Sequence, residues 1–164
     1  MIPSYAAGIL MQGNCPALVG GGVFSAENEN RFVWDRSGLM DVRHAVISEE
    51  KRCGCSRARA VLMVSVLILS AASEAADWLI PAEFLDLSPE NVWFDPSERK
   101  VRFCLAENTG THFDSIFDLL LRLSALEAPE THAYLSKLKE KAETEHSHLE
   151  TIKKELSLRL TGPG

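Results

Sequence analysis

The most apolar part of the chain lies near its middle. Residues 60–73 contain no charged side chain; Ser56 before them is a typical helix N-cap, and Pro81 after them cannot continue a helix. The pattern therefore predicts one long helix from residue 56 to about 78. Its first half is apolar on every side, which is typical of a helix covered on most faces. A membrane span needs about 20 apolar residues, so a buried core helix is the preferred interpretation.

Towards the start of the chain, residues 17–24 and 31–34 are rich in β-branched and aromatic side chains and are separated by a polar segment. This is the pattern of an antiparallel hairpin. Three glycines at 20–22 predict a bend in its first strand. Residues 1–14 have no clear period and are predicted to be irregular or a short helix.

A second hairpin is predicted from residues 92–94 and 101–103. Its turn opens with Asp95 followed by a proline, where the carboxylate can accept local backbone hydrogen bonds and the proline ring fixes φ. Just before this hairpin, Ser88 is predicted to cap a tight turn, with Pro89 at the first helical position.

Two shorter helices follow from apolar spacing. Residues 39–48 predict a short helix on the N-terminal side of the central one. Thr111 and Asp114 resemble a capping box ahead of an amphipathic helix over residues 113–126.

The last part of the chain is predicted to be one long charged helix over residues 130–160, after a break at Pro129. An apolar stripe runs along it for about three and a half heptads, and six acids alternate with six bases around it. Two alternatives stay open: the stripe packs on its own domain, or it pairs with a second copy as a coiled coil. The stripe consists of Leu135, Leu138, Ala142, Glu145, Leu149, Ile152, Leu156 and Arg159.

The composition is that of a globular protein with one sizeable core: 164 residues, 46% of them apolar. A net charge of −6 argues against a dedicated nucleic-acid binder, because neutralising phosphates requires a basic surface. The first ten residues carry no basic side chain and so do not resemble a secretory signal. We therefore expect a cytoplasmic protein without a transmembrane segment.

The four cysteines show no disulfide or zinc spacing and are interpreted as reduced thiols. Cys53 and Cys55 lie in a segment, residues 51–59, that is predicted to be a basic loop with four positive charges. A C-x-C pair is shorter than the C-x-x-C of redox helices and zinc knuckles, so inert thiols are favoured; a reactive pair activated by its basic neighbours is the alternative. For the basic stretch at 43–59, which holds five bases and two acids, a solvated face is favoured over packing against the acidic stretch at 74–118 or contact of the basic loop with an anionic partner.

Motifs of catalysis and metal binding are missing. The five histidines have no metal-ligand spacing and are interpreted as solvated, and the chain has neither a nucleophile elbow nor a phosphate-binding glycine loop. The sequence therefore assigns no catalytic, cofactor-binding or metal-binding residue and predicts no cofactor.

The most specific string is Phe84-Leu-Asp-Leu-Ser-Pro-Glu-Asn91. It resembles the catalytic loop of protein kinases, His-Arg-Asp-Leu-Lys-Pro-Glu-Asn, at five of eight positions. With the order of elements around it, residues 14–124 resemble a kinase-like domain of Gram-positive bacteria that often precedes a forkhead-associated domain. The pseudokinase-like domain of a type VII secretion membrane component is more distantly similar. By this resemblance Asp86 falls at the catalytic-base position and Asn91 at a magnesium-ligand position.

The departures from the kinase pattern argue against catalysis. Ser88 replaces the phosphate-binding lysine, and Leu105 falls where the metal-binding aspartate is expected. There is no glycine-rich loop and no lysine-bearing third strand, so the small lobe is either degenerate or outside this sequence. Because phosphoryl transfer depends on these groups, Asp86 and Asn91 are interpreted as closing a turn.

These observations predict an α+β fold: the helical lobe of a kinase-like fold with two short hairpins over residues 1–128, then a long helix over 129–164. The expected function is non-catalytic binding of a protein partner in bacterial signalling or secretion, inferred from the resemblance. Two alternatives stay open. One is a minimal Mg-ATP-dependent phosphotransferase using Asp86 and Asn91, and the other is an oligomerisation module forming a homodimer through residues 130–160.

Overall fold

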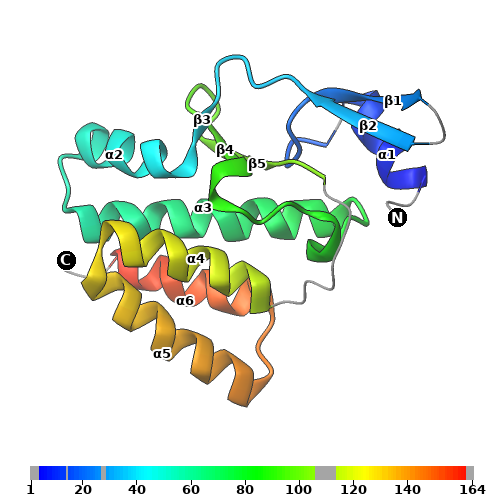
Figure 1. Ribbon diagram of the computed structural model, residues 1–164. Coiled ribbons are helices and arrows are strands. Elements are labelled where there is room, and N and C mark those ends of the chain that lie inside the picture. The colour runs from blue at the N-terminus through cyan, green and yellow to red at the C-terminus, as the bar shows by residue number, and fades with distance from the viewer. Residues whose placement is uncertain (1–3, 14, 27–28, 106–113, 162–164) are drawn as a thin grey trace.

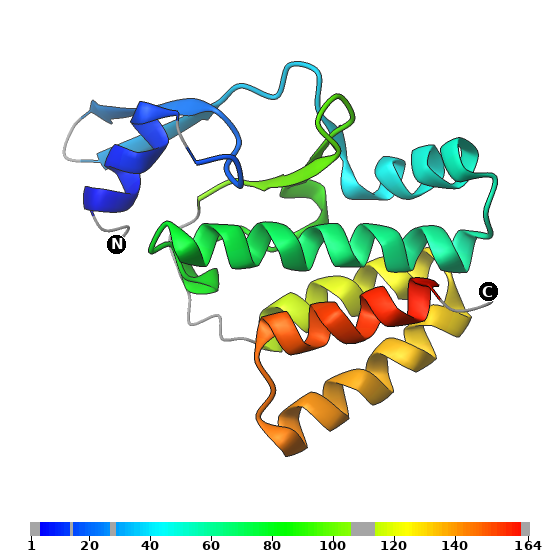
Figure 2. The ribbon, with the colours of Figure 1, turned by 180° about the vertical axis from the view of Figure 1, so that it is seen from behind.

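The computed structural model describes residues 4–13, 15–26, 29–105 and 114–161. The fold is α+β, as predicted, with helix α3 at its centre (Figure 1). Two small antiparallel sheets and helix α2 lie on one side of α3, and three helices lie on the other (Figure 2). The elements are α1 (Ser4–Gln12), β1 (Gly21–Ala26), β2 (Glu29–Trp34), β3 (Met40–Asp41), α2 (Val42–Cys53), α3 (Arg57–Asp77), the 3-10 turns η1 (Ala82–Phe84) and η2 (Pro89–Asn91), β4 (Val92–Asp95), β5 (Lys100–Phe103), α4 (Asp114–Glu127), α5 (Pro129–Glu145) and α6 (Leu149–Thr161).

The first predicted hairpin is present as β1 and β2, and α1 packs beside it. Residues 17–19, which were predicted to start its first strand, instead bond to Phe103 of β5. Strand β1 begins at Gly21, which pairs with Trp34. A Cβ atom at Gly21 would lie only 2.2 Å from the carbonyl oxygen of Val33, so this position requires glycine. The glycines thus allow a close approach of two backbones.

Helix α2 is longer and starts later than the predicted helix over residues 39–48. Asp41 is its N-cap, and the Asp41 carboxylate accepts hydrogen bonds from the backbone N–H groups of Arg43 and His44, each at 3.0 Å. The helix continues to Cys53, where Gly54 adopts φ 61°, the left-handed conformation that ends many helices. The predicted basic loop is therefore wrong for most of its length, because its first residues are the last turn of α2 and only residues 54–56 connect α2 to α3.

Helix α3 confirms the predicted core helix. The Ser56 hydroxyl accepts a hydrogen bond from the backbone N–H of Arg59 at 3.2 Å, as an N-cap does. The helix contacts α2, α4, α5, α6 and β5. It is also the one helix among the described residues that is long and apolar enough to cross a membrane, but 56% of its most apolar window is buried inside the protein. Its apolarity is therefore explained by burial in the core. Its buried side chains are Ala60, Val61, Leu62, Val64, Ser65, Ile68, Leu69, Ala71, Ala72 and Ala75.

The second predicted hairpin is confirmed as β4 and β5, and the two-residue strand β3 extends it to three strands. Val92, Phe94, Val101 and Phe103 are all buried and point towards α3 and the rest of the core. The Asp95 carboxylate accepts hydrogen bonds from the backbone N–H groups of Ser97 and Glu98, as the turn chemistry predicted.

The predicted amphipathic helix is present as α4, with its apolar positions in the core and Asp118 exposed. The predicted capping box begins at Thr111, which lies outside the described residues. Asp118 forms an ion pair with Lys139 of α5, at 3.3 Å, which ties the two helices together at the surface.

The single long helix predicted over residues 130–160 is wrong. The chain forms two helices, α5 and α6, which reverse direction at His146 (Figure 2). His146 has φ 51°, its N–H bonds to the carbonyl of Ala142, and the N–H of Ser147 bonds to the same carbonyl. Helix α5 packs on α4, and α6 packs on α3.

The apolar stripe is divided between these two helices and faces the protein's own core, so the first of the two alternatives holds. These side chains belong to the same cluster of buried residues as α3, on both sides of the expected boundary at residue 128. Its fully buried members are Leu135, Leu138, Ala142, Ile152 and Leu156.

Candidate functional site

The loop that resembles a kinase catalytic loop lies between the end of α3 and the β4–β5 hairpin. Leu85 is buried and forms a β-bridge with Leu105, and the backbone N–H of Asp86 donates to the carbonyl of Cys104 at 2.8 Å. Pro89 occupies the first position of η2, as predicted. The predicted capping by the Ser88 side chain is wrong, because this side chain makes no cap hydrogen bond.

The side chains of Asp86 and Asn91 bond to each other and to the loop. One Asp86 oxygen accepts the backbone N–H of Ser88 at 3.0 Å, and the other accepts the Asn91 side-chain amide at 2.9 Å. Asp86 therefore closes the turn, as the sequence predicted, and holds Asn91 beside it.

The chemistry next to Asp86 is unreactive. Cys104 is buried, and burial together with the nearby Asp86 carboxylate raises the pKa of the Cys104 thiol to about 12, although Arg36 opposes the shift. This thiol stays protonated near neutral pH and is a poor nucleophile. The Arg36 guanidinium lies over the ring of Trp93, 5.0 Å from its centroid.

Leu105, the residue at the expected metal-binding position, is 4% exposed and belongs to the hydrophobic core. It supplies no ligand, and the next two residues of the triplet lie outside the described residues. Across the described part of the chain, no group of three or more His, Cys, Asp or Glu side chains could hold a metal ion. Among the described residues, Asp86 and Asn91 therefore lack the additional metal ligand and the phosphate-binding lysine of a kinase nucleotide site.

A cleft of about 410 Å³ lies on another face of the β4–β5 hairpin. Its walls are α1, the segment from Cys15 to Gly20, the linker after β2 and the β4–β5 turn. The linker side contributes Asp35, whose carboxylate accepts hydrogen bonds that lower its pKa, chiefly from Ser37. Sequence reasoning did not find this cleft, because its walls come from four segments far apart in the chain.

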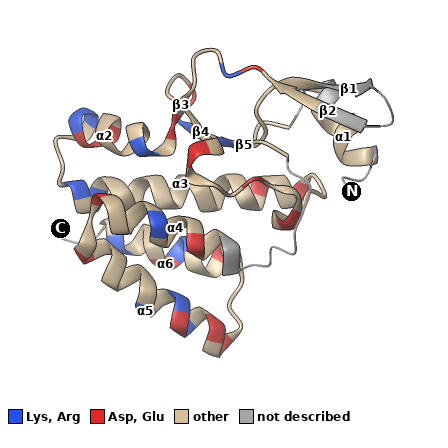
Figure 3. Ribbon diagram, in the orientation of Figure 1, with Lys and Arg blue, Asp and Glu red and all other residues tan. Residues whose placement is uncertain are grey.

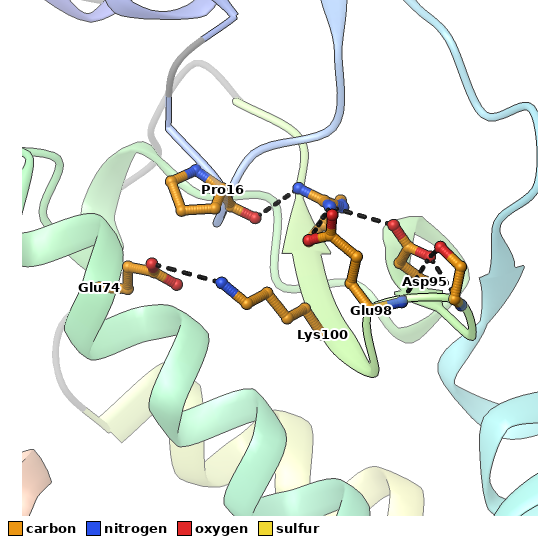
Figure 4. A network of polar contacts seen from close by, with 7 residues as sticks. Pro16, Glu74, Asp95, Glu98 and Lys100 are labelled. Atoms are coloured by element: carbon orange, nitrogen blue, oxygen red, sulfur yellow. Dashed lines mark hydrogen bonds and ion pairs between the residues drawn. The ribbon is translucent and has the colours of Figure 1, made fainter.

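Arg102 fixes the hairpin side of the cleft. Its partners Pro16, Asp95 and Glu98 lie close together in Figure 4. Its guanidinium donates to the carbonyl of Pro16 at 2.6 Å, to Asp95 at 3.0 Å and to Glu98 at 3.3 Å. Hydrogen bonds from Ser97, helped by Arg102 and opposed by burial, lower the pKa of Asp95 to about 2. The charges on this wall therefore satisfy one another and hold residue 16 against the hairpin, which is a structural role.

Lys and Arg residues gather at the end of α2 and the start of α3 (Figure 3). The arginines among them are paired. Arg57 bonds to Glu50 and, at 2.8 Å, to Glu127 at the end of α4; Arg43 lies 3.5 Å from the same Glu127. Arg59 bonds to the carbonyl of Leu160 in α6. These arginines join α2, α3, α4 and α6. The prediction that they form a solvated face is therefore only partly right. Because they are paired, these side chains do not form a free anion-binding patch.

Among the described residues, Glu49 is the one charged side chain that is almost fully buried, at 1% exposed. Its carboxylate accepts hydrogen bonds from Arg52, at 2.9 and 3.2 Å, and from Arg99 in the β4–β5 turn at 2.7 Å. Burial alone would raise the pKa of Glu49, but the two arginines outweigh it and lower the pKa. Sequence reasoning missed this residue, since only the spacing of Glu49 and Arg52 hints at a pair.

The four histidines that the structure describes do not form a site. His44 contacts Asp41 at 2.7 Å and is exposed, as expected. His132 is half-buried and contacts the carbonyl of Leu121 at 3.0 Å, so its predicted solvation is wrong. His146 and His148 are exposed, and His112 lies outside the described residues.

All four cysteines are free thiols. Cys15 and Cys104 are buried, whereas Cys53 is exposed and Cys55 is half-buried at the α2–α3 connection. Burial raises the pKa of Cys15.

Comparison with known proteins neither supports nor contradicts the resemblance to protein kinases. No family model matches the chain, and no curated protein is significantly similar to it.

Proposed function

We propose that this protein is a non-catalytic kinase-like domain that binds another protein in the cytoplasm of a bacterium, in signalling or secretion. The order of elements supports the proposal: a hairpin and linker, α2, the buried α3, the Leu87–Asn91 turn, the β4–β5 hairpin and α4 follow one another as the resemblance implies. The pathway is taken from that resemblance.

The observation that carries the non-catalytic part is the bonding of Asp86 to Asn91 and to the backbone of Ser88. A kinase needs the equivalent carboxylate for the substrate hydroxyl and the equivalent amide for magnesium. Here both groups close their own loop, Ser88 offers no positive charge to a phosphate, and Leu105 is part of the core.

Two exposed side chains, Leu79 and Tyr5, support protein binding. Leu79 is 73% exposed although it lies next to the core residue Ile80, and it has φ 62°, which is unusual for leucine. The hydroxyl of exposed Tyr5 donates to the Leu79 carbonyl at 2.9 Å and so connects α1 to this turn. Strained backbone conformations of this kind cluster at functional sites, and at Leu79 the strained residue presents an apolar side chain to solvent.

Calorimetric titration with Mg-ATP tests the non-catalytic part. We expect no binding in the micromolar range for the wild-type protein. Micromolar binding that is lost in Asn91→Ala and kept in Asp77→Asn, an exposed carboxylate at the end of α3, would overturn the proposal in favour of the phosphotransferase.

The heptad pattern no longer supports a homodimer through residues 130–160, because the large apolar side chains of the stripe are buried in the protein's own core. On the outer side of α6, Leu158 is 62% exposed and remains available for such a contact. Sedimentation velocity of the full chain and of Leu158→Glu decides the matter. We expect both proteins to sediment as monomers. A dimer of the wild type that Leu158→Glu dissociates would establish the oligomerisation module.

A further inference from the structure

The α2–α3 connection carries two thiols at one corner of the molecule. Cys53 is the last residue of α2, and Cys55 immediately precedes Ser56, the N-cap of α3. Gly54 between them has φ 61° and ψ 29°. This is the mirror image of helical backbone, so the Cα atoms of the flanking residues are about 5.4 Å apart, the distance between residues i and i+2 of an α-helix.

That distance suits a disulfide, whose Cα atoms usually lie roughly 4.4 to 6.8 Å apart. The two thiols also interact with each other in the reduced protein. Burial raises the pKa of Cys55, and the nearby Cys53 thiol adds to the shift through its charge and a hydrogen bond. The Cys53 and Cys55 side chains therefore lie near each other at this turn.

The two thiols differ in their exposure to solvent, which suits them to different steps of thiol–disulfide exchange. Cys53 is exposed and can meet a reagent from solution, whereas Cys55 is half-buried beside it. The pKa of Cys55 stays raised, because the charge of Arg59 only partly opposes the effect of burial, so the more exposed Cys53 is the thiol that reacts first. Cys15 and Cys104 are buried elsewhere and give the protein its own unreactive reference thiols.

We propose that Cys53 and Cys55 form a reversible dithiol–disulfide site that exchanges with low-molecular-weight disulfides. The Cys53 thiolate attacks one sulfur of the small disulfide, forms a mixed disulfide and releases one small thiolate. The Cys55 thiolate then attacks the Cys53 sulfur and releases the second. The protein loses two electrons and two thiol protons, the small disulfide gains both, and two small thiols result. In a reducing cytoplasm such a pair is transiently oxidised, as redox-sensing cysteines are.

The test uses the full-length reduced protein in buffers of varied reduced and oxidised glutathione, quenched with a maleimide in denaturant. We expect four labels in the reduced protein and two in the oxidised protein, with the missing labels mapped to Cys53 and Cys55. Cys55→Ser should stop at a stable mixed disulfide on Cys53. The double variant Cys15→Ser with Cys104→Ser should still lose two labels.

Repeating the titration in concentrated urea tests whether the folded state favours formation of the Cys53–Cys55 disulfide. We expect the equilibrium constant for ring closure to be severalfold larger in the folded protein, because Gly54 already holds the two residues at bonding distance. An equal or smaller constant in the folded state would overturn the proposal. So would four labels at the most oxidising ratio, a lasting mixed disulfide in the wild type, or loss of labels at Cys15 and Cys104.

Discussion

Two carboxylates hold the chain in different ways. Asp86 bonds to groups two and five residues further along its own loop, and the resulting turn is half-exposed. Glu49 is almost fully buried and joins its own helix to Arg99, fifty residues away in the β4–β5 turn. The hydrogen bonds of Asp86 connect residues that are already close in sequence. The hydrogen bonds of Glu49 join α2 to the β4–β5 turn, so their loss should destabilise the whole fold.

The largest effect is expected from Glu49→Gln. The amide keeps the shape but removes the charge that two arginines share, and a buried hydrogen bond to a charged group stabilises by about 1.5–3 kcal/mol. We therefore expect the free energy of unfolding to fall by about 2 kcal/mol, measured by urea denaturation.

A double-mutant cycle with Arg99→Ala shows whether the long-range contact is responsible. If Arg99→Ala destabilises the wild type but has no further effect in Glu49→Gln, the contact joins α2 to the hairpin as described. Additive effects would contradict this role. Glu50→Gln serves as the matched control, since Glu50 lies next in the same helix and is less buried.

A smaller effect is expected from Asn91→Ala. Its side chain is exposed and makes a single hydrogen bond to Asp86. Exposed interactions of this kind contribute about 0.5 kcal/mol, so urea denaturation should show a loss of that order. A loss as large as that of Glu49→Gln would mean that this loop also supports the fold as a whole.

The last expected effect is confined to acid and concerns Asp95. The pKa of Asp95 is lowered from 3.8 to about 2 in the folded protein, so its contribution to stability is present above about pH 4 and is lost as the pH falls towards 2. In Asp95→Asn the decrease in unfolding free energy over this range should be smaller than in the wild type. An unchanged acid profile would mean that the hydrogen bonds from Ser97 and Arg102 do not favour the ionised form.

The comparison also shows which site residues the sequence could supply. Asp86 and its loop were predictable, because donor and acceptor lie within five residues. Glu49, Glu127 and the walls of the cleft were not, because each gains its partners from elements that are distant in sequence. For the cysteine pair, the sequence showed only a short spacing, and the left-handed Gly54 was needed to bring the two thiols together.

By itself, the sequence determined the elements whose signals are local: the Ser56 cap, the Asp95 turn, the buried helix α3 and both hairpins. Only the tertiary structure decided that residues 130–160 break at His146. Helical spacing and charge favour one continuous helix, and a histidine gives no glycine-like signal for an end. A left-handed residue costs roughly 1–2 kcal/mol, whereas burying each large apolar side chain gains about 1.5–3 kcal/mol. Folding α6 back onto α3 buries Ile152 and Leu156 against the core, and this gain outweighs the local cost.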